Sequence, residues 1–469
     1  MKLFSIRIIT NSLENLQALK QFNLDLNRHS AVKRDDQHFS IKGILNEDQV
    51  IQIRQAGYFV EIKEDLSKVA ADRLQEVSNI NRFAGPTIAT EATERTILGY
   101  LTVEEINSFI EGLQHQYPEI VTLIDLPHPT WEGRKCQALR LRTTVQADRT
   151  GVLILGNVHA REWGGSDICI HFLTQILQAY HEKTPITYGG KKYEYEQIRT
   201  LMDRLDIYVF PEVNPDGKVY SQTADLKEDD QNLWWRKNRR PNGPQLPKGV
   251  DLNRNFDFLW NSDIGSSKDH SSYLYKGPSP FSEPETQNVK YLLDTYHSIQ
   301  YFTDIHSYGG LILYNWGDDN NQSYHSEQNF RNPDFDGKRG KVEENVNGDY
   351  KEYIEAQDEQ TEIELAHRMN DALRSVRNQS YTVQQAVGLY PTSATSDDYA
   401  YSRHLTNPAR SKIYSFTIEF GSPDGEFVPP YEEMRKIMDD VGAALTEMCL
   451  YAATNNKERN IRVGEKSNH

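Results

Sequence analysis

The sequence has few cysteines. Only three of its 469 residues are cysteine: Cys136, Cys169 and Cys449. A sparse and odd set does not describe a disulfide framework, and the wide spacing does not describe a thiolate metal site. We therefore expect all three to be small buried residues.

Long apolar runs are also missing. No segment approaches the roughly 18 consecutive apolar residues that a membrane-spanning helix needs. The first residues, MKLFSIRIITNSLENL, lack the apolar run of a signal peptide. We therefore expect a cytoplasmic chain with no membrane partner, and export by another route stays open.

Basic residues are outnumbered by acidic ones. Lys and Arg total 52 against 68 Asp and Glu, which gives a formal net charge of −16. This balance argues against nucleic acid as a partner, because nucleic-acid binding depends on basic surfaces. The length and the 37% hydrophobic content fit one large globular domain with a smaller one.

The first part of the chain predicts a small α/β unit over residues 1–64. Strand-like runs at residues 4–9, 39–44 and 58–62 alternate with two helical patterns. Residues 65–97 are charged, then small and polar, which is typical of a linker between domains.

The rest of the chain, residues 98–455, predicts one large α/β domain. Apolar strands alternate with helical stretches, which favours a mixed, mostly parallel sheet with helices on both faces. Functional groups then belong at the carboxyl ends of the strands. Residues 317–357 are polar and turn-rich and predict a surface insertion, and residues 456–469 form a polar tail.

Three residues suggest a metal site at the carboxyl ends of the predicted strands. His159 and Glu162 directly follow the apolar run GVLILGNV, and His306 ends another apolar strand, YFTDIHSY. Imidazole nitrogen and carboxylate oxygen are both good zinc donors. Two His and one Glu leave a coordination position open, as catalytic zinc sites do.

Seven blocks of sequence carry a resemblance to a known family. In order they are GNVHAREW (156–163), FPEVNPDG (210–217), LWWRKNRR (233–240), GVDLNRNF (249–256), DIHSYGGLILYNWG (304–317), YPTSATSDDYAY (390–401) and YSFTIEFG (414–421). Together they resemble the A/B-type zinc metallocarboxypeptidases over about residues 97–455. The resemblance implies a zinc-dependent exopeptidase that acts on the C-termini of peptides or proteins.

The resemblance implies one zinc ion, held by His159, Glu162 and His306. Asp251 resembles the carboxylate that orients the first zinc histidine.

Two further residues resemble the family's catalytic groups. Glu419 resembles the general base that takes a proton from the zinc-bound water. Arg236 resembles the arginine that stabilises the negative charge on the carbonyl oxygen.

Five residues resemble substrate-binding positions. Asn253 and Arg254 resemble the pair that binds the terminal carboxylate, and a planar guanidinium suits that task. Tyr390 resembles the mobile phenol that closes over the site. Arg161 and Tyr308 match positions that line the next subsite.

Asp397 carries the specificity prediction. Members of the family that cut after apolar side chains have an aliphatic residue at this position, and those that cut C-terminal Lys or Arg have Asp. The chain therefore resembles carboxypeptidase B. If the alignment is shifted by one residue, Asp398 is the matching residue and Asp397 is a solvated loop residue, which leaves a broader or apolar specificity open.

The chain also departs from the family. It lacks cysteines for a disulfide found in secreted members between the WWRK and VDLNRN blocks, and Leu233 replaces a channel arginine. The small N-terminal unit resembles a pro-domain that packs over the active-site cleft and is removed after cleavage at Arg73 or Arg95. A permanently attached stabilising domain is the alternative.

Two other functions are compatible with parts of the sequence. The same scaffold serves amidases that act on bacterial wall peptides or acyl-amino acids, but Arg254 and Tyr390 favour ordinary peptide C-termini. A peptide-binding protein without activity would lack Glu419 or a zinc ligand, and all of these are present.

Overall fold

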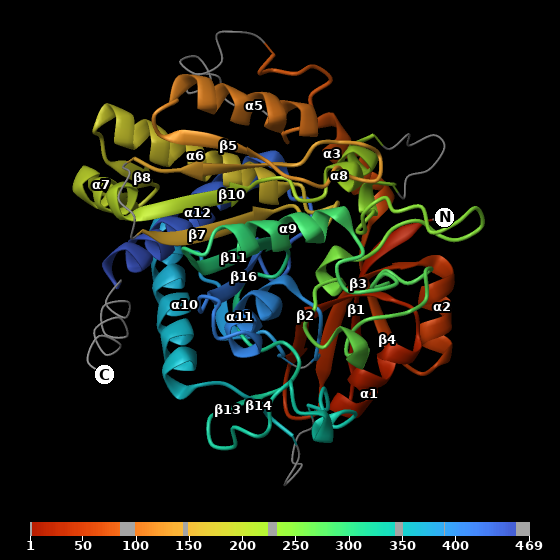
Figure 1. Ribbon diagram of the computed structural model, residues 1–469. Coiled ribbons are helices and arrows are strands. Elements are labelled where there is room, and N and C mark those ends of the chain that lie inside the picture. Colours follow the sequence, from red (N-terminus) through yellow and green to blue (C-terminus); the bar gives the residue numbers. More distant parts are fainter. Residues whose placement is uncertain are drawn as a thin grey trace.

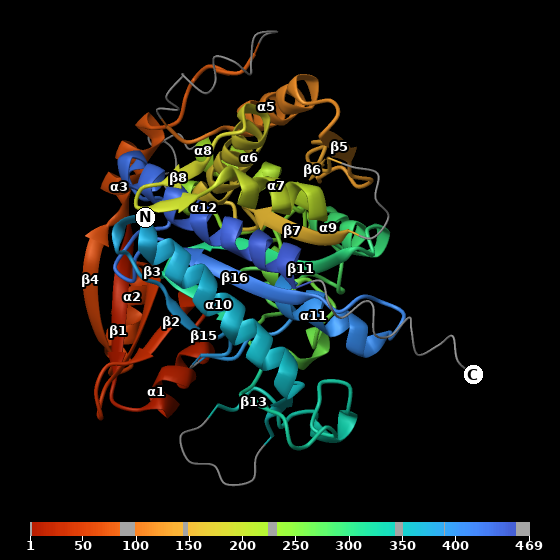
Figure 2. The ribbon, with the colours of Figure 1, turned by 90° about the vertical axis from the view of Figure 1, so that its left-hand side faces the viewer.

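The computed structural model describes residues 2–84, 99–143, 149–223, 232–342, 350–388 and 390–455. These residues form a small N-terminal unit beside a larger α/β domain (Figures 1 and 2). The predicted fold class is confirmed.

The N-terminal unit is a four-stranded antiparallel sheet with the strand order β2-β3-β1-β4. Its elements are β1 (Leu3–Thr10), α1 (Leu13–Ala18), β2 (Asp25–Lys33), β3 (Phe39–Asn46), α2 (Glu47–Gln55) and β4 (Phe59–Asp65). The Ser12 hydroxyl caps α1, and Asn46 and Gln49 form a capping box at the start of α2. Leu16 and Ile53 bring both helices into the core of the unit.

Strand β2 was not predicted. It lies at the edge of the sheet, its sequence DLNRHSAVK is mostly polar, and its register with β3 shifts between Asn27 and Val32. An irregular edge strand has little of the apolar alternation that identifies strands from sequence.

The large domain is built on an eight-stranded mixed sheet with the order β15-β12-β16-β11-β7-β10-β6-β5. The central strands β16, β11, β7 and β10 are parallel, and β12, β6 and β5 add antiparallel pairings. The strands are β5 (Val121–Asp125), β6 (Gln137–Leu141), β7 (Thr150–Gly156), β10 (Leu205–Phe210), β11 (Ile299–Ser307), β12 (Leu311–Tyr314), β15 (Thr382–Gln385) and β16 (Tyr414–Phe420).

Helices cover both faces of this sheet. On β7, Val152 and Ile154 pack into one core, with helices α5 (Val103–Gln116), α6 (Gly164–Glu182), α7 (Tyr195–Arg204), α10 (Ala356–Arg377) and α12 (Tyr431–Thr454). Leu153 and Leu155 pack into the other core, with α9 (Pro284–Thr295) and α11 (Ser396–Thr406). Burial on both faces explains why the central strands are apolar throughout.

The remaining elements are short. In the described ranges they are α8 (Pro215–Gln222), the hairpin β8 (Ile186–Tyr188) and β9 (Lys191–Tyr193), and the 3₁₀ turns η1 (Leu19–Gln21), η2 (Asn232–Trp234), η3 (Leu252–Arg254), η4 (Trp260–Ser262) and η5 (Pro333–Phe335). In the polar stretch 317–357, β13 (Asn321–Gln322) pairs with β14 (Glu352–Tyr353).

The stretch predicted as a linker includes helix α3 (Leu66–Gln75). Arg73 on this helix is buried and donates from Nε to the carbonyl oxygen of Val428 at 2.9 Å, so its expected exposure as a cleavage site is wrong. Arg95 and the tail 456–469 lie outside the described residues.

The three cysteines are buried and unpaired, as expected. Among the helices that the structure describes, none combines the length and apolar character that crossing a membrane requires.

Candidate active site

Two neighbouring parallel strands bring the three candidate metal ligands together. Strand β7 leads into the turn that carries His159 and Glu162, and β11 carries His306 near its end. Since Gly156 of β7 lies opposite Ile305 of β11, the carboxyl ends of both strands meet at one sheet edge.

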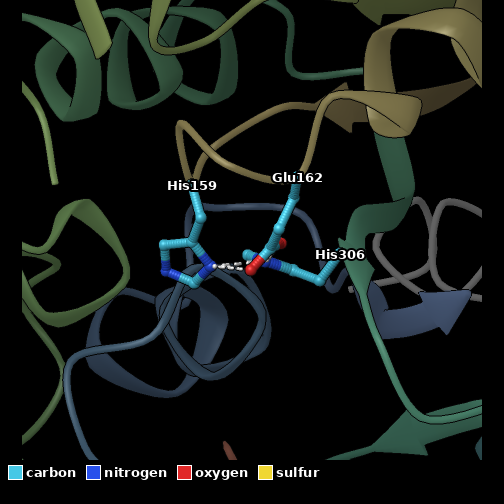
Figure 3. A group of neighbouring side chains, drawn as sticks. All are labelled: His159, Glu162 and His306. Carbon is cyan, nitrogen blue, oxygen red and sulfur yellow. Dashed lines mark hydrogen bonds and ion pairs between the residues drawn. The ribbon is translucent and has the colours of Figure 1, made fainter. Parts of the chain in front are cut away.

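All three side chains are buried and point toward one another (Figure 3). Glu162 lies between the imidazoles, with 2.9 Å from Oε1 to His159 Nδ1 and 3.0 Å from Oε2 to His306 Nδ1. The two Nδ1 atoms are 3.0 Å apart. One ligand atom from each residue lies within 4.8 Å of the others, and no other such group of three occurs in the described ranges.

The donor set fits zinc. Two imidazole nitrogens and a carboxylate oxygen are its usual ligands at catalytic sites. Two lone-pair-bearing nitrogens facing each other at this distance repel unless a cation lies between them.

A carboxylate behind each imidazole fixes its orientation. His159 Nε2 lies 3.2 Å from Asp251 Oδ1, and His306 Nε2 lies 3.0 Å from Asp304 Oδ2. Each ring therefore turns Nδ1 toward the centre of the site. Burial opposes ionisation of Asp251, but the charges of Arg236 and His159 hold its pKa well below its usual range.

Asp304 was missed by the sequence analysis. It lies two residues before His306 on β11 and so shares its face of the strand. The two-residue spacing from His306 could have identified Asp304 as its partner. A single aspartate within an apolar strand, however, does not by itself indicate a functional residue.

Glu419 stands beside the three ligands. It lies on β16 directly opposite His306 of the parallel strand β11. Its neighbours Ile418 and Phe420 face the opposite side, into the helix-covered core. Glu419 Oε2 is buried and has no hydrogen-bond partner among the residues described. Burial raises the pKa of Glu419 to about 8, although the charge on His306 lowers it.

Arg236 reaches the same centre from the loop after η2. Its Nε and Nη2 donate to Asp251 Oδ2 at 3.2 and 3.0 Å. Asp251 therefore joins the orientation of His159 to the placement of the Arg236 guanidinium. Leu233, within η2, is fully buried.

Arg254 is a buried cation with no carboxylate partner in the described part of the chain. Its Nε donates to the Gly265 carbonyl oxygen at 2.9 Å and its Nη1 to that of Asn253 at 2.5 Å. Burial lowers the pKa of Arg254 to about 10; the charge of Asp251 opposes this effect, and the charges of Arg236 and Arg28 add to it. The group is therefore suited to receive an anion.

Asn253 ties this region to the metal ligands. Its Nδ2 lies 3.4 Å from His306 Nε2, and its Oδ1 accepts from the backbone N–H of Ser396 at 2.8 Å.

Asp397 and Asp398, at the start of α11, have different surroundings. Asp397 accepts from Thr417 Oγ1 at 3.0 Å, and Thr417 is on the Glu419 face of β16. Asp398 faces away, accepting from Asn315 Nδ2 at 2.9 Å and from the Gly317 N–H. Of the two, Asp397 is on the side of the metal ligands.

Three candidate substrate residues contact β2 of the N-terminal unit. The Arg161 guanidinium forms a two-armed ion pair with the Asp25 carboxylate. The Tyr308 carbonyl oxygen accepts from Asn27 Nδ2 at 2.8 Å. The third contact joins Arg28 to Tyr390, with the guanidinium 4.4 Å from the ring centroid. Because β2 was not predicted, its contacting residues were missed as well.

Tyr390 belongs with the core of the N-terminal unit. It is buried against that core, and its phenol oxygen has no hydrogen-bond partner among the described residues.

Comparisons with known proteins agree with this geometry. A model of the family described as "Zinc carboxypeptidase" matches residues 106–444. Carboxypeptidase B of Helicoverpa zea is 30% identical over 53% of this chain and 52% of its own length. Carboxypeptidase B of Astacus astacus is 34% identical over 46% of this chain and 64% of its own length. Carboxypeptidase O of Bos taurus is 33% identical over 49% of this chain and 56% of its own length. The chain thus spans about half to two thirds of these curated relatives.

Two solved structures share the fold. The crystal structure of thrombin activatable fibrinolysis inhibitor matches with a TM-score of 0.70 at 20% identity, over 97% of this chain and 100% of its own. The crystal structure of carboxypeptidase A from Helicoverpa armigera matches with a TM-score of 0.71 at 20% identity, over 97% of this chain and 98% of its own.

Proposed function

The chain belongs to the zinc carboxypeptidase family, and from this premise we propose that it removes single residues from the C-termini of peptides, with a preference for Lys and Arg. The observation that carries the proposal is the buried Arg254 guanidinium, which has no carboxylate partner among the described residues and is joined through Asn253 to the metal ligands. An enzyme that cuts only at chain ends must bind a free carboxylate, and a guanidinium binds it in two places at once.

Zinc, when held by His159, Glu162 and His306, supplies a Lewis acid that polarises the scissile carbonyl and makes water a stronger acid. The unpartnered Oε2 of Glu419 accepts a proton from the attacking water. The protonated Glu419 then acts as a general acid and donates that proton to the leaving amine.

Arg236 supports the same step from the other side. Its guanidinium is placed by Asp251 and carries N–H groups suited to the oxygen on which negative charge develops. Because it is already fixed before the reaction, little reorganisation is needed as the charge forms.

Asp397 is the basis for the preference for basic residues. It is buried, accepts from one hydroxyl and one backbone N–H, and forms no ion pair with a cation of the described segments. The charged end of a substrate Lys or Arg would supply that cation. An apolar side chain would leave the carboxylate desolvated and unpaired, at a cost of about 3–5 kcal/mol.

The N-terminal unit acts in this proposal as a cover over the substrate positions. Support comes from its contacts with Arg161, Tyr308 and Tyr390, which engage three proposed substrate residues at once. Access to these residues then requires the unit to move or be removed. A permanently attached stabilising domain is the alternative that the experiments below distinguish.

A panel of peptides tests the specificity. The zinc-loaded chain, before and after limited proteolysis, is incubated with peptides ending in Lys, Arg, Phe, Leu and Glu and with bacterial wall peptides. We expect loss of a single Lys or Arg, read from product masses. Turnover of the wall peptides alone would instead support an amidase.

A further inference from the structure

A second group of acidic side chains lies away from the active site, in the polar stretch 317–357. Asp318 and Glu352 are both fully buried, and the backbone N–H of Glu352 donates to the carbonyl oxygen of Asn320 at 2.9 Å, which brings the two segments together. Neither oxygen of Asp318 has a hydrogen-bond donor among the residues described.

Glu352 is held from two sides. Its Oε1 accepts from the backbone N–H of Phe330 at 2.8 Å, and its Oε2 accepts from the Tyr350 hydroxyl at 2.5 Å. Each carboxylate oxygen has a second lone pair, so both remain able to bind a cation.

No basic side chain in the described ranges forms an ion pair with Asp318 or Glu352. Arg339 is a cation whose charge acts on Glu352, but its Nη1 forms an ion pair with Asp336 at 2.5 Å. Its Nη2 donates to the backbone carbonyl oxygens of Asn329 and Asn332. Arg339 therefore forms no direct ion pair with either carboxyl, and its charge lowers the pKa of Glu352 less than burial raises it.

A third buried carboxylate lies close by and adds to the charge. Asp398 accepts from the N–H of Gly317, the residue before Asp318. Burial, followed by the charges of Glu352 and Asp398, raises the pKa of Asp318 well above its ordinary range. Burial raises the pKa of Glu352 to about 7. Adjacent buried carboxyls need either a shared proton or a bound cation.

We propose that Asp318 and Glu352 bind a calcium ion that fastens the 317–357 segment to the large domain. Oxygen ligands alone suit a hard cation, and calcium accepts irregular oxygen sets completed by water and backbone carbonyls. Zinc does not fit here, since the pair has neither nitrogen nor sulfur donors.

The position of the pair gives the ion a structural consequence. Asp318 follows Gly317, which contacts Asp398, and Asp398 N–H donates to Asp397 Oδ1 at 3.0 Å. Binding at Asp318 therefore stabilises the loop that adjoins Asp397, without contact with the zinc ligands.

Terbium luminescence tests the site, because Tb³⁺ replaces Ca²⁺ at oxygen sites and is excited through a nearby phenol. Tyr350, bonded to Glu352, is that phenol. In the zinc-loaded full chain, freed of calcium, we expect Tb³⁺ emission that Ca²⁺ displaces with a Kd below about 1 mM. Mg²⁺ should compete at least tenfold less well.

Asp318→Asn and Glu352→Gln should weaken the Ca²⁺ competition by at least tenfold, whereas Asp334→Asn, at an exposed carboxylate of the same segment, should not. Absence of Ca²⁺-displaceable emission in the unsubstituted chain would overturn the proposal and favour a shared proton. That measurement decides the matter even if a variant does not fold. Retained affinity in folded Asp318→Asn would also contradict it.

Discussion

At the scale of single residues, the zinc ligands and Glu419 have different tasks: the ligands bind the metal and Glu419 transfers the proton. Glu419 does not belong to the group of three close ligands, although it lies opposite His306 on the neighbouring strand. Metal binding and proton transfer are therefore separable by substitution.

The first prediction uses this separation. Glu419→Gln should keep one zinc per chain and lower kcat by roughly 10²–10⁴-fold, since the amide cannot accept the proton. His159→Ala should lose tightly bound zinc, and chelators should abolish activity that zinc restores. Zinc content and single-substrate kinetics measure both. Near-normal kcat in Glu419→Gln would exclude its role as base.

The second prediction concerns pH. Only the ionised Glu419 accepts a proton, so kcat/KM should rise with pH through its pKa. Burial raises that pKa to about 8 without metal, and a nearby cation lowers it. The acid limb of the zinc enzyme should therefore have a midpoint below 8. A kcat/KM that falls steadily from pH 5 to pH 8 would contradict this assignment.

The third prediction concerns Asp397. Breaking a buried ion pair costs about 3–5 kcal/mol, and each 1.4 kcal/mol is about tenfold in rate. Lys and Arg should therefore be preferred over Leu and Phe by on the order of 10² or more in kcat/KM. Asp397→Ile should reverse the preference and leave zinc affinity and the acid limb unchanged. Equal cleavage of C-terminal Phe and Arg by the unsubstituted enzyme would mean that Asp397 does not line the pocket.

At the scale of elements, the sequence predicts the regular strands well. Runs buried on both faces identify β7, β11 and β16, and the end of a run locates His159 and His306. The parallel order then places these ends at one edge of the sheet. This is why the metal ligands were predictable from one sequence.

Contacts between distant segments were not predictable in the same way. Asp25 and Arg161 are 136 residues apart, and nothing in either local sequence specifies the other. Asp304 was hidden for a different reason: its partner His306 is two residues further along the same strand, and the pairing has a meaning only once His306 is identified as a metal ligand. Long-range polar pairs depend on the packed fold, and local periodicity does not encode them.

The fourth prediction concerns strand β2. Asp25→Ala removes one partner of a buried ion pair and should weaken the cover by about 3–5 kcal/mol at most. The full chain should then gain kcat/KM, whereas Asp35→Asn, at an exposed carboxylate of the same unit, should not change it. Activity assays of intact variants, checked by mass, measure the effect.

One result would contradict the proposal that the N-terminal unit covers the substrate positions. Equal kcat/KM for the full chain and a cleaved 97–469 form would mean that the N-terminal unit does not restrict access. The unit would then be a stabilising domain, and removing it should lower Tm instead.

At the scale of the whole molecule, the N-terminal unit packs against the large domain, and Leu3 and Ile44 of its sheet join one core of that domain. The large domain supplies the metal ligands, Glu419 and Arg254, and strand β2 of the smaller sheet contributes Asp25, Asn27 and Arg28. The net charge of −16 does not describe the surroundings of the metal ligands, where burial and then the charges of Arg236 and Arg28 lower the pKa of Arg254. Arg254, which forms no ion pair with a carboxylate of the described residues, suits a substrate that brings its own carboxylate.

The fifth prediction tests the central claim, which is recognition of a free C-terminal carboxylate. Two peptides ending in Arg, identical except that one is amidated, are incubated with the zinc-loaded, cleaved enzyme, and products are identified by mass. Amidation removes the charge that pairs with Arg254. We predict that the free peptide loses one Arg and that kcat/KM for the amidated peptide is lower by on the order of 10² or more. Equal rates for the two peptides, or cleavage at an internal bond, would contradict the account.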